Sequence, residues 1–104
     1  MGIKNKSYVV DIVKEFIEII SKEYSINSVY IFGSYCYGNP TQDSDIDIAV
    51  ILNESVDEIK DFEIFRRAQK LNPDLEAVVF SVDEFNRDLS DIIVEIKQKG
   101  EKVA

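Results

Sequence analysis

The apolar residues of the chain recur with two different periods, which separate the expected helices from the expected strands. From Tyr8 to Tyr24 they fall three and four positions apart, which predicts an amphipathic helix with Ser7 as its N-terminal cap. The same period returns over 59–71 and again over 85–96, so we predict two further helices. Their apolar faces are, in chain order, Val9, Ile12, Val13, Phe16, Ile19 and Ile20; Ile59, Phe62, Ile64, Phe65, Ala68 and Leu71; and Phe85, Leu89, Ile92, Ile93 and Ile96.

Three short runs rich in β-branched residues predict strands over 29–32, 46–52 and 75–82. A loop is expected at 38–41, and Asn72-Pro73 and Gly100 end the second and third helices. The first two strands are joined by about a dozen residues without a clear helix. We therefore expect these strands to be antiparallel, with a short helical turn beginning near Ser34.

The order of these elements predicts the class of fold. Helix, strand, strand, helix, strand and helix indicate a single domain over residues 1–104, with an α/β (α+β) fold in two layers: a small mixed sheet and helices packed on it. Apolar residues make up 45% of the chain and aromatic residues 11%, which is typical of a globular protein and not of a disordered one.

Carboxylates interrupt two of the predicted strands. Asp45 and Asp47 project from the same side of the second strand, because side chains alternate along a strand. Glu76 interrupts the third strand in the same way and approaches the two aspartates if the third strand lies beside the second. Three oxygen ligands without histidine or cysteine suit Mg²⁺ or Mn²⁺ better than zinc. We therefore take Asp45, Asp47 and Glu76 as candidate metal ligands.

Gly33-Ser34, directly after the first predicted strand, is a candidate phosphate site. A glycine at this point lets the backbone approach a ligand closely, and a following helical turn presents free N–H groups. Ser34 adds a hydroxyl donor. A Gly-Ser turn, or a strand with two exposed aspartates, is common without any function, so each feature alone is weak evidence and the combination is more specific.

Charge and composition narrow the classes of partner. The net charge is −8, and residues 25–82 hold most of the excess, with ten acidic and four basic residues. Such a region is either simply solvated or works with bound cations, and it disfavours direct binding to nucleic acid. No apolar run approaches the length of a membrane span and no signal peptide is evident, so we expect no membrane association and a cytoplasmic location. With one cysteine and no histidine, a structural zinc site is not expected.

The spacing of the motif resembles that of a known superfamily. Gly33-Ser34, ten intervening residues and then Asp45-x-Asp47 is similar to the signature of the DNA polymerase beta-like nucleotidyltransferases. The fuller string GSYCYGNPTQDSDIDIAV and the length of the chain resemble the minimal nucleotidyltransferases (MNT), small prokaryotic proteins. The resemblance covers roughly residues 8–96.

The resemblance implies a specific reaction and specific roles. A nucleoside monophosphate, AMP from ATP, would be transferred to a hydroxyl with release of pyrophosphate. Asp45, Asp47 and Glu76 would be catalytic and would hold two Mg²⁺ ions, or Mn²⁺, while Gly33 and Ser34 would bind the nucleotide. Many members of this family are antitoxins encoded beside a HEPN-type ribonuclease toxin, and several silence it by adding AMP to a tyrosine.

Three departures from the family pattern keep a second function open. Cys36 and Tyr37 stand where a small residue and an arginine are usual, and Glu76 replaces the usual aspartate. The alternative is therefore a catalytically weak or inactive antitoxin that masks its partner by binding. A transferase acting on small molecules is disfavoured, because we expect no second domain to form an acceptor pocket. Three helices on a small sheet also predict an exposed apolar surface, for a partner or for an oligomer.

Overall fold

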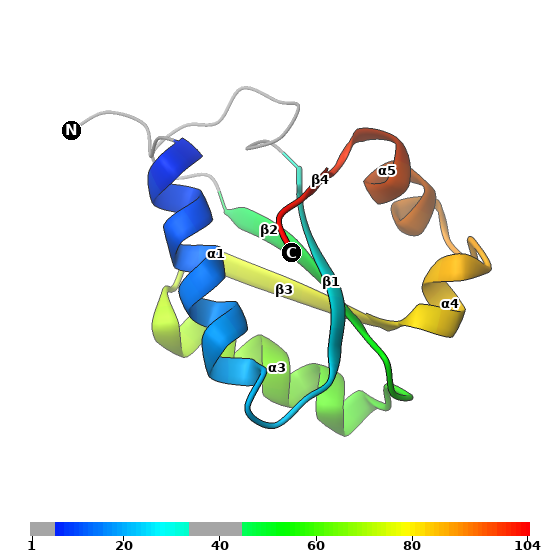
Figure 1. Ribbon diagram of the computed structural model, residues 1–104, viewed down its shortest axis with the longest axis horizontal. Coiled ribbons are helices and arrows are strands. Elements are labelled where there is room, and N and C mark those ends of the chain that lie inside the picture. Colours follow the sequence, from blue (N-terminus) through cyan, green and yellow to red (C-terminus); the bar gives the residue numbers. More distant parts are fainter. Residues whose placement is uncertain (1–5, 34–44) are drawn as a thin grey trace.

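A four-stranded mixed sheet forms the centre of the fold in the computed structural model, which describes residues 6–33 and 45–104 (Figure 1). β1 is antiparallel to both β2 and β4, whereas β2 and β3 are parallel. The predicted antiparallel pairing of the first two strands is therefore confirmed. In their spatial order the strands are β3 (Leu75–Ser81), β2 (Ile46–Leu52), β1 (Ile26–Phe32) and the short β4 (Glu101–Lys102).

The helices begin at residues that satisfy their free N–H groups. At the start of α3 the Asp57 side chain accepts a hydrogen bond from the Lys60 N–H. At the start of α5 the Ser90 side chain accepts one from the Ile93 N–H. None of the described helices is long and apolar enough to cross a membrane. The helices that the structure describes are α1 (Lys6–Ile20), α3 (Glu58–Leu71), α4 (Val82–Asn86) and α5 (Asp91–Lys99).

One face of the sheet is closed by α1 and α3. Every second residue of β2 points to this face and is fully buried: Ile46, Ile48, Val50 and Leu52. The helices contribute the residues that pack against them, since both helices carry an apolar stripe of period three to four. These are Val9, Val13, Phe16 and Ile20 from α1, and Ile64 and Ala68 from α3.

The opposite face is covered less completely, by α4 and α5. Ala49 and Ile51 of β2 pack there with Phe85 of α4 and with Ile93 and Ile96 of α5. By the alternation of side chains along β2, Asp47 belongs to this second face. The predicted mixed α/β fold is confirmed, and helices lie on both faces of the sheet and not in one layer only.

Two details differ from the sequence-based expectations. The last helical region is two helices, because Asp88 adopts a left-handed conformation (φ 53°) between them and Ser90 caps a new helix. The strand β4 was not predicted, since its two residues are too few to show a period. The helical turn expected near Ser34 and the loop expected at 38–41 lie outside the described residues.

Candidate active site

Asp47 and Glu76 lie opposite each other near the starts of the parallel strands β2 and β3. Two hydrogen bonds hold these strand starts in place: the Ile46 N–H donates to the Asp74 carbonyl, and Gln69 Nε2 donates to the Leu75 carbonyl, each at 2.6 Å. Paired residues of neighbouring strands project to the same side of the sheet. The sequence-based expectation that Glu76 approaches the aspartates is therefore confirmed.

The pKa values of the facing carboxyl groups are raised. Burial, followed by the charges of Glu76 and Asp45, raises the pKa of Asp47 to about 6. Burial, followed by the charge of Asp45 and a hydrogen bond to it, also raises the pKa of Glu76. Among the described residues, no lysine or arginine forms an ion pair with these three acids. The acids therefore repel one another, and a cation would relieve the repulsion.

Gly33 lies directly against the Asp47 carboxylate. Its φ of 75° is left-handed, and a Cβ atom at this position would lie 2.3 Å from Oδ2 of Asp47. A side chain here would therefore collide with the carboxylate as well as strain the backbone. The end of β1 therefore lies directly against the Asp47 carboxylate of β2. Ser34, Cys36 and Tyr37 lie outside the described residues.

The three acids have the right chemistry for a divalent cation but do not form a finished cage. Within residues 6–33 and 45–104, no three side chains of the metal-binding types are grouped closely enough to hold a metal ion. Asp47 and Glu76 are nevertheless paired in the register of β2 and β3, and the charge of Asp45 acts on both, so the three carboxyl groups are neighbours. An all-oxygen set of this kind fits Mg²⁺ or Mn²⁺ by the chemistry of its donor atoms.

A cleft of about 470 Å³ opens beside the facing acids. Asp47 and Glu76 line one part of it, and residues of β1, β3, α3 and α5 line the rest. A volume of this size is within the range of small-molecule and side-chain binding sites, roughly 300–1,000 Å³. The remaining lining residues are Phe32, Glu58, Asp61, Phe62, Phe65, Ala77, Val78 and Ile92.

Six apolar residues that the sequence placed on the apolar faces of helices are exposed. The exposed fraction is 77% for Ile59, 62% for Phe62 and Leu89, 38% for Ile19, and 37% for Phe65 and Ile92. For the three residues of α3 among them, the prediction of burial is wrong because α3 has apolar residues on two sides, and only Ile64 and Ala68 of this helix are buried. The signal was present in the sequence: Phe62 and Ile64 are two positions, or about 200°, apart on a helix.

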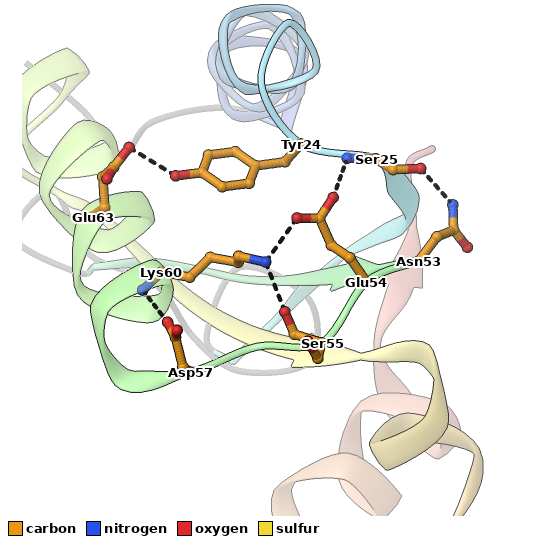
Figure 2. A network of polar contacts seen from close by, with 8 residues as sticks. All are labelled: Tyr24, Ser25, Asn53, Glu54, Ser55, Asp57, Lys60 and Glu63. Carbon is orange, nitrogen blue, oxygen red and sulfur yellow. Dashed lines mark hydrogen bonds and ion pairs between the residues drawn. The ribbon is translucent and has the colours of Figure 1, made fainter.

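A network of polar contacts holds the N-terminal half of α3 against the chain that enters β1 (Figure 2). Lys60 Nζ donates to Glu54 Oε1 and to the Ser55 carbonyl, both at 2.7 Å, and Glu54 Oε2 accepts from the Ser25 N–H at 3.0 Å. The Tyr24 hydroxyl donates to Glu63 Oε1 at 2.7 Å. Burial and this hydrogen bond raise the pKa of Tyr24 to about 12. The network fixes the helix whose other side lines the cleft.

A mixed sheet with acids at the starts of two parallel strands and a glycine turn against them defines a nucleotidyltransferase domain. Comparison with family models gives the same result: residues 14–104 match the model described as polymerase beta, nucleotidyltransferase. The chain belongs to this family, which confirms the resemblance seen in the sequence.

Related sequences carry names of protein adenylyltransferases. A Methanocaldococcus jannaschii protein, provisionally named a protein adenylyltransferase, is 39% identical over 61 residues, which are 59% of this chain and 62% of that protein. Protein adenylyltransferase MntA of Shewanella oneidensis is 44% identical over 55 residues, 53% of this chain and 37% of MntA. The chain thus matches less than two thirds of the length of either relative.

Solved structures confirm the fold. A toxin–antitoxin complex with AMP-PNP matches with a TM-score of 0.66 and 21% identity over 91% of this chain and 72% of the other. An MNT antitoxin in complex with a tri-AMPylated HEPN toxin of Shewanella oneidensis matches with a TM-score of 0.60 and 21% identity, over 96% and 72% of the two chains. The sequence identities are low, so these structures support the shared architecture.

Proposed function

We propose that this protein is an antitoxin that transfers AMP from ATP to a tyrosine hydroxyl of a HEPN-type toxin. The observation that carries the proposal is the pairing of Asp47 with Glu76 across two parallel strands, with Gly33 packed against Asp47. The named relatives supply the reaction class, since they are protein adenylyltransferases. The structural neighbours supply the partner class, since they include an antitoxin bound to an AMPylated HEPN toxin.

Asp45, Asp47 and Glu76 would hold the divalent cations, two Mg²⁺ ions or Mn²⁺, on the second face of the sheet. When bound, such cations neutralise the charge of the triphosphate and of the transition state. Without them, the net charge of −8 and the clustered acids would repel ATP. Gly33 would bring the backbone close to the triphosphate, and Ser34 would donate a hydroxyl hydrogen bond to it.

Glu76 would also help to remove the proton of the acceptor hydroxyl. As a carboxylate paired with Asp47 across the two strands, it is placed to accept that proton. The hydroxyl oxygen forms a bond to the α-phosphorus of ATP, the bond from that phosphorus to the bridging oxygen breaks, and pyrophosphate leaves with the electron pair. The product is a phosphodiester between AMP and the tyrosine. An enzyme that consumes ATP also agrees with the expected cytoplasmic location.

A second candidate function is masking of the toxin by contact alone. The exposed Phe62, Ile59 and Leu89 favour it, because apolar side chains on a surface are suited to a protein partner. The departures at Cys36, Tyr37 and Glu76 favour it as well, since each changes a site on which catalysis would depend.

The intact mass of the toxin separates the two functions. The toxin that copurifies with this protein is incubated with Mg²⁺ and ATP, and the mass gain per toxin is measured. We expect additions of one AMP unit each with the natural protein, none with Asp45→Asn, and normal addition with Asp11→Asn, a control at an exposed position of α1. If the Asp45→Asn variant neutralises the toxin fully and no mass change occurs, the protein masks its partner and the proposed transfer is wrong.

A further inference from the structure

An open groove runs from the facing acids along β3 and α3. We call it the aromatic groove and define it by Phe62, Phe65 and Ile92, with Asp47 and Glu76 at one end. α3 crosses back along the sheet toward the start of β3, so the first turn of α3 lies at the opposite end of the groove (Figure 1). Glu58 lies three and four positions before Asp61 and Phe62, and these lie four and three positions before Phe65, so the four residues form one stripe of that helix.

The two ends of the aromatic groove differ from its middle. Glu58 and Asp61 make the outer end acidic, and the charge of Glu84, at the start of α4, acts on Asp61 there. Among the described residues, neither Glu58 nor Asp61 is ion-paired with a lysine or arginine. The middle is apolar, because the walls are the rings of Phe62 and Phe65 and the side chain of Ile92. The inner end holds the acids of the candidate active site.

We propose that the aromatic groove docks the acceptor segment of the protein substrate, with a tyrosine at its inner end and basic residues at its outer end. The identity of this occupant rests on the proposed function, which requires a hydroxyl beside Glu76. A tyrosine places an apolar ring between the groove walls and its hydroxyl at the acids, whereas a serine or threonine lacks the ring to fill the space. Lysine or arginine side chains complement the acids at the outer end.

The exposed edge of β3 offers the segment a path between these two ends. In the described sheet β3 pairs only with β2, so the backbone groups on its other side are free of strand partners. An extended segment can follow such an edge. From Glu76 to the end of β3 is about five residues, or about 17 Å at the rise of an extended chain. The basic residues are therefore expected about five positions from the tyrosine.

Binding of synthetic peptides tests this inference without ATP or metal. The probe is a fluorescent peptide with one central tyrosine, glycine and serine spacers, and arginines about five residues to either side. Its affinity for the natural protein is measured by fluorescence anisotropy. We expect the same peptide with glutamates in place of the arginines to bind at least tenfold more weakly, a tyrosine-to-phenylalanine peptide to bind equally well, and a tyrosine-to-serine peptide to bind several-fold more weakly.

Variants of the protein locate the binding to the groove. The double change Glu58→Lys and Asp61→Lys should weaken binding of the arginine peptide about tenfold at low salt and less at high salt. Phe62→Ser should weaken it about fivefold. Matched controls are Ile59→Ser, at an exposed residue of α3 outside the cleft lining, and Glu15→Lys with Glu18→Lys on α1. The control variants should bind as the natural protein does.

Several results would overturn the inference. One is that the arginine and glutamate peptides bind with equal affinity or do not bind at all. Another is that the Phe62→Ser and charge-reversal variants bind the arginine peptide with the affinity of the natural protein. Sedimentation of the natural protein as a dimer that Phe62→Ser dissociates would assign the aromatic groove to a second copy of the chain. If the groove binds the peptide as expected but the toxin gains no AMP, the proposed transfer fails and the docking surface stands.

Discussion

The strand β2 presents different kinds of residue to the two faces of the sheet, and the two faces differ in burial. On the face under α1 and α3, β2 presents Ile46, Ile48, Val50 and Leu52, and all are fully buried. On the face under α4 and α5, the same strand presents Asp47, Ala49 and Ile51, and burial is incomplete at Asp47. The first face supplies the stability that holds Asp47 at a fixed position. The second face leaves that carboxylate open to solvent, to a cation and to a substrate.

The largest expected effect is on catalysis at the open face. Asp47→Asn removes a charge that the proposed cation site needs, and we expect the rate of AMP transfer to fall about 1,000-fold, equivalent to about 4 kcal/mol in activation free energy. The initial rate of AMP incorporation into the toxin measures this. A variant that retains a tenth of the natural rate would show that Asp47 is not part of the reacting site.

The next largest effect is on stability at the closed face. Ile48→Ala, one residue further along β2, leaves a cavity under α1 and α3 and should lower the free energy of unfolding by about 3 kcal/mol. Urea unfolding followed by circular dichroism provides the measurement. Ile59→Ala is the control, because Ile59 is 77% exposed and its loss should change stability by less than about 0.5 kcal/mol.

A smaller effect is expected where β1 meets the open face. Gly33→Ala should lower the free energy of unfolding by about 2 kcal/mol, because alanine at a φ of 75° is strained and its Cβ meets the Asp47 carboxylate. In the double variant with Asp47→Ala the collision is removed, so the two changes should be less than additive. Strictly additive effects would mean that the two residues do not press on each other.

The smallest effect is a gain in stability at Asp47 itself. The folded pKa of about 6 lies above the ordinary aspartate value of 3.8, so the natural protein loses stability as the pH rises from about 4 to about 6 and Asp47 becomes charged. The full rise corresponds to about 3 kcal/mol, and screening of this half-buried group reduces it to about 1–2 kcal/mol. Asp47→Asn should therefore match the natural protein below pH 4 and be more stable above pH 6. Thermal unfolding across this pH range, without added metal, measures the difference.

Individual residues show which parts of the site could be predicted from the sequence. Asp47 and Glu76 interrupt apolar strands, and that local pattern was enough to single them out, whereas their proximity was predicted only if the two strands were adjacent. Phe62, Phe65 and Ile92 have helical spacing as well, but spacing does not say which of two apolar stripes faces the sheet. Glu58 and Asp61 look like ordinary acids in the first turn of a helix. Their position at the end of a cleft depends on how α3 crosses the sheet.

The three long strands, the alternation that separates Asp47 from Ile48, and the glycine at the end of β1 could all be read from the sequence, because they depend on periods of two to four residues and on local backbone conformation. Three features emerged only in the folded chain: β2 and β3 are parallel neighbours in register, helices cover both faces, and the aromatic groove joins α3 and α5 to the acids. These features depend on contacts between residues far apart in the chain, whose energies no local pattern contains.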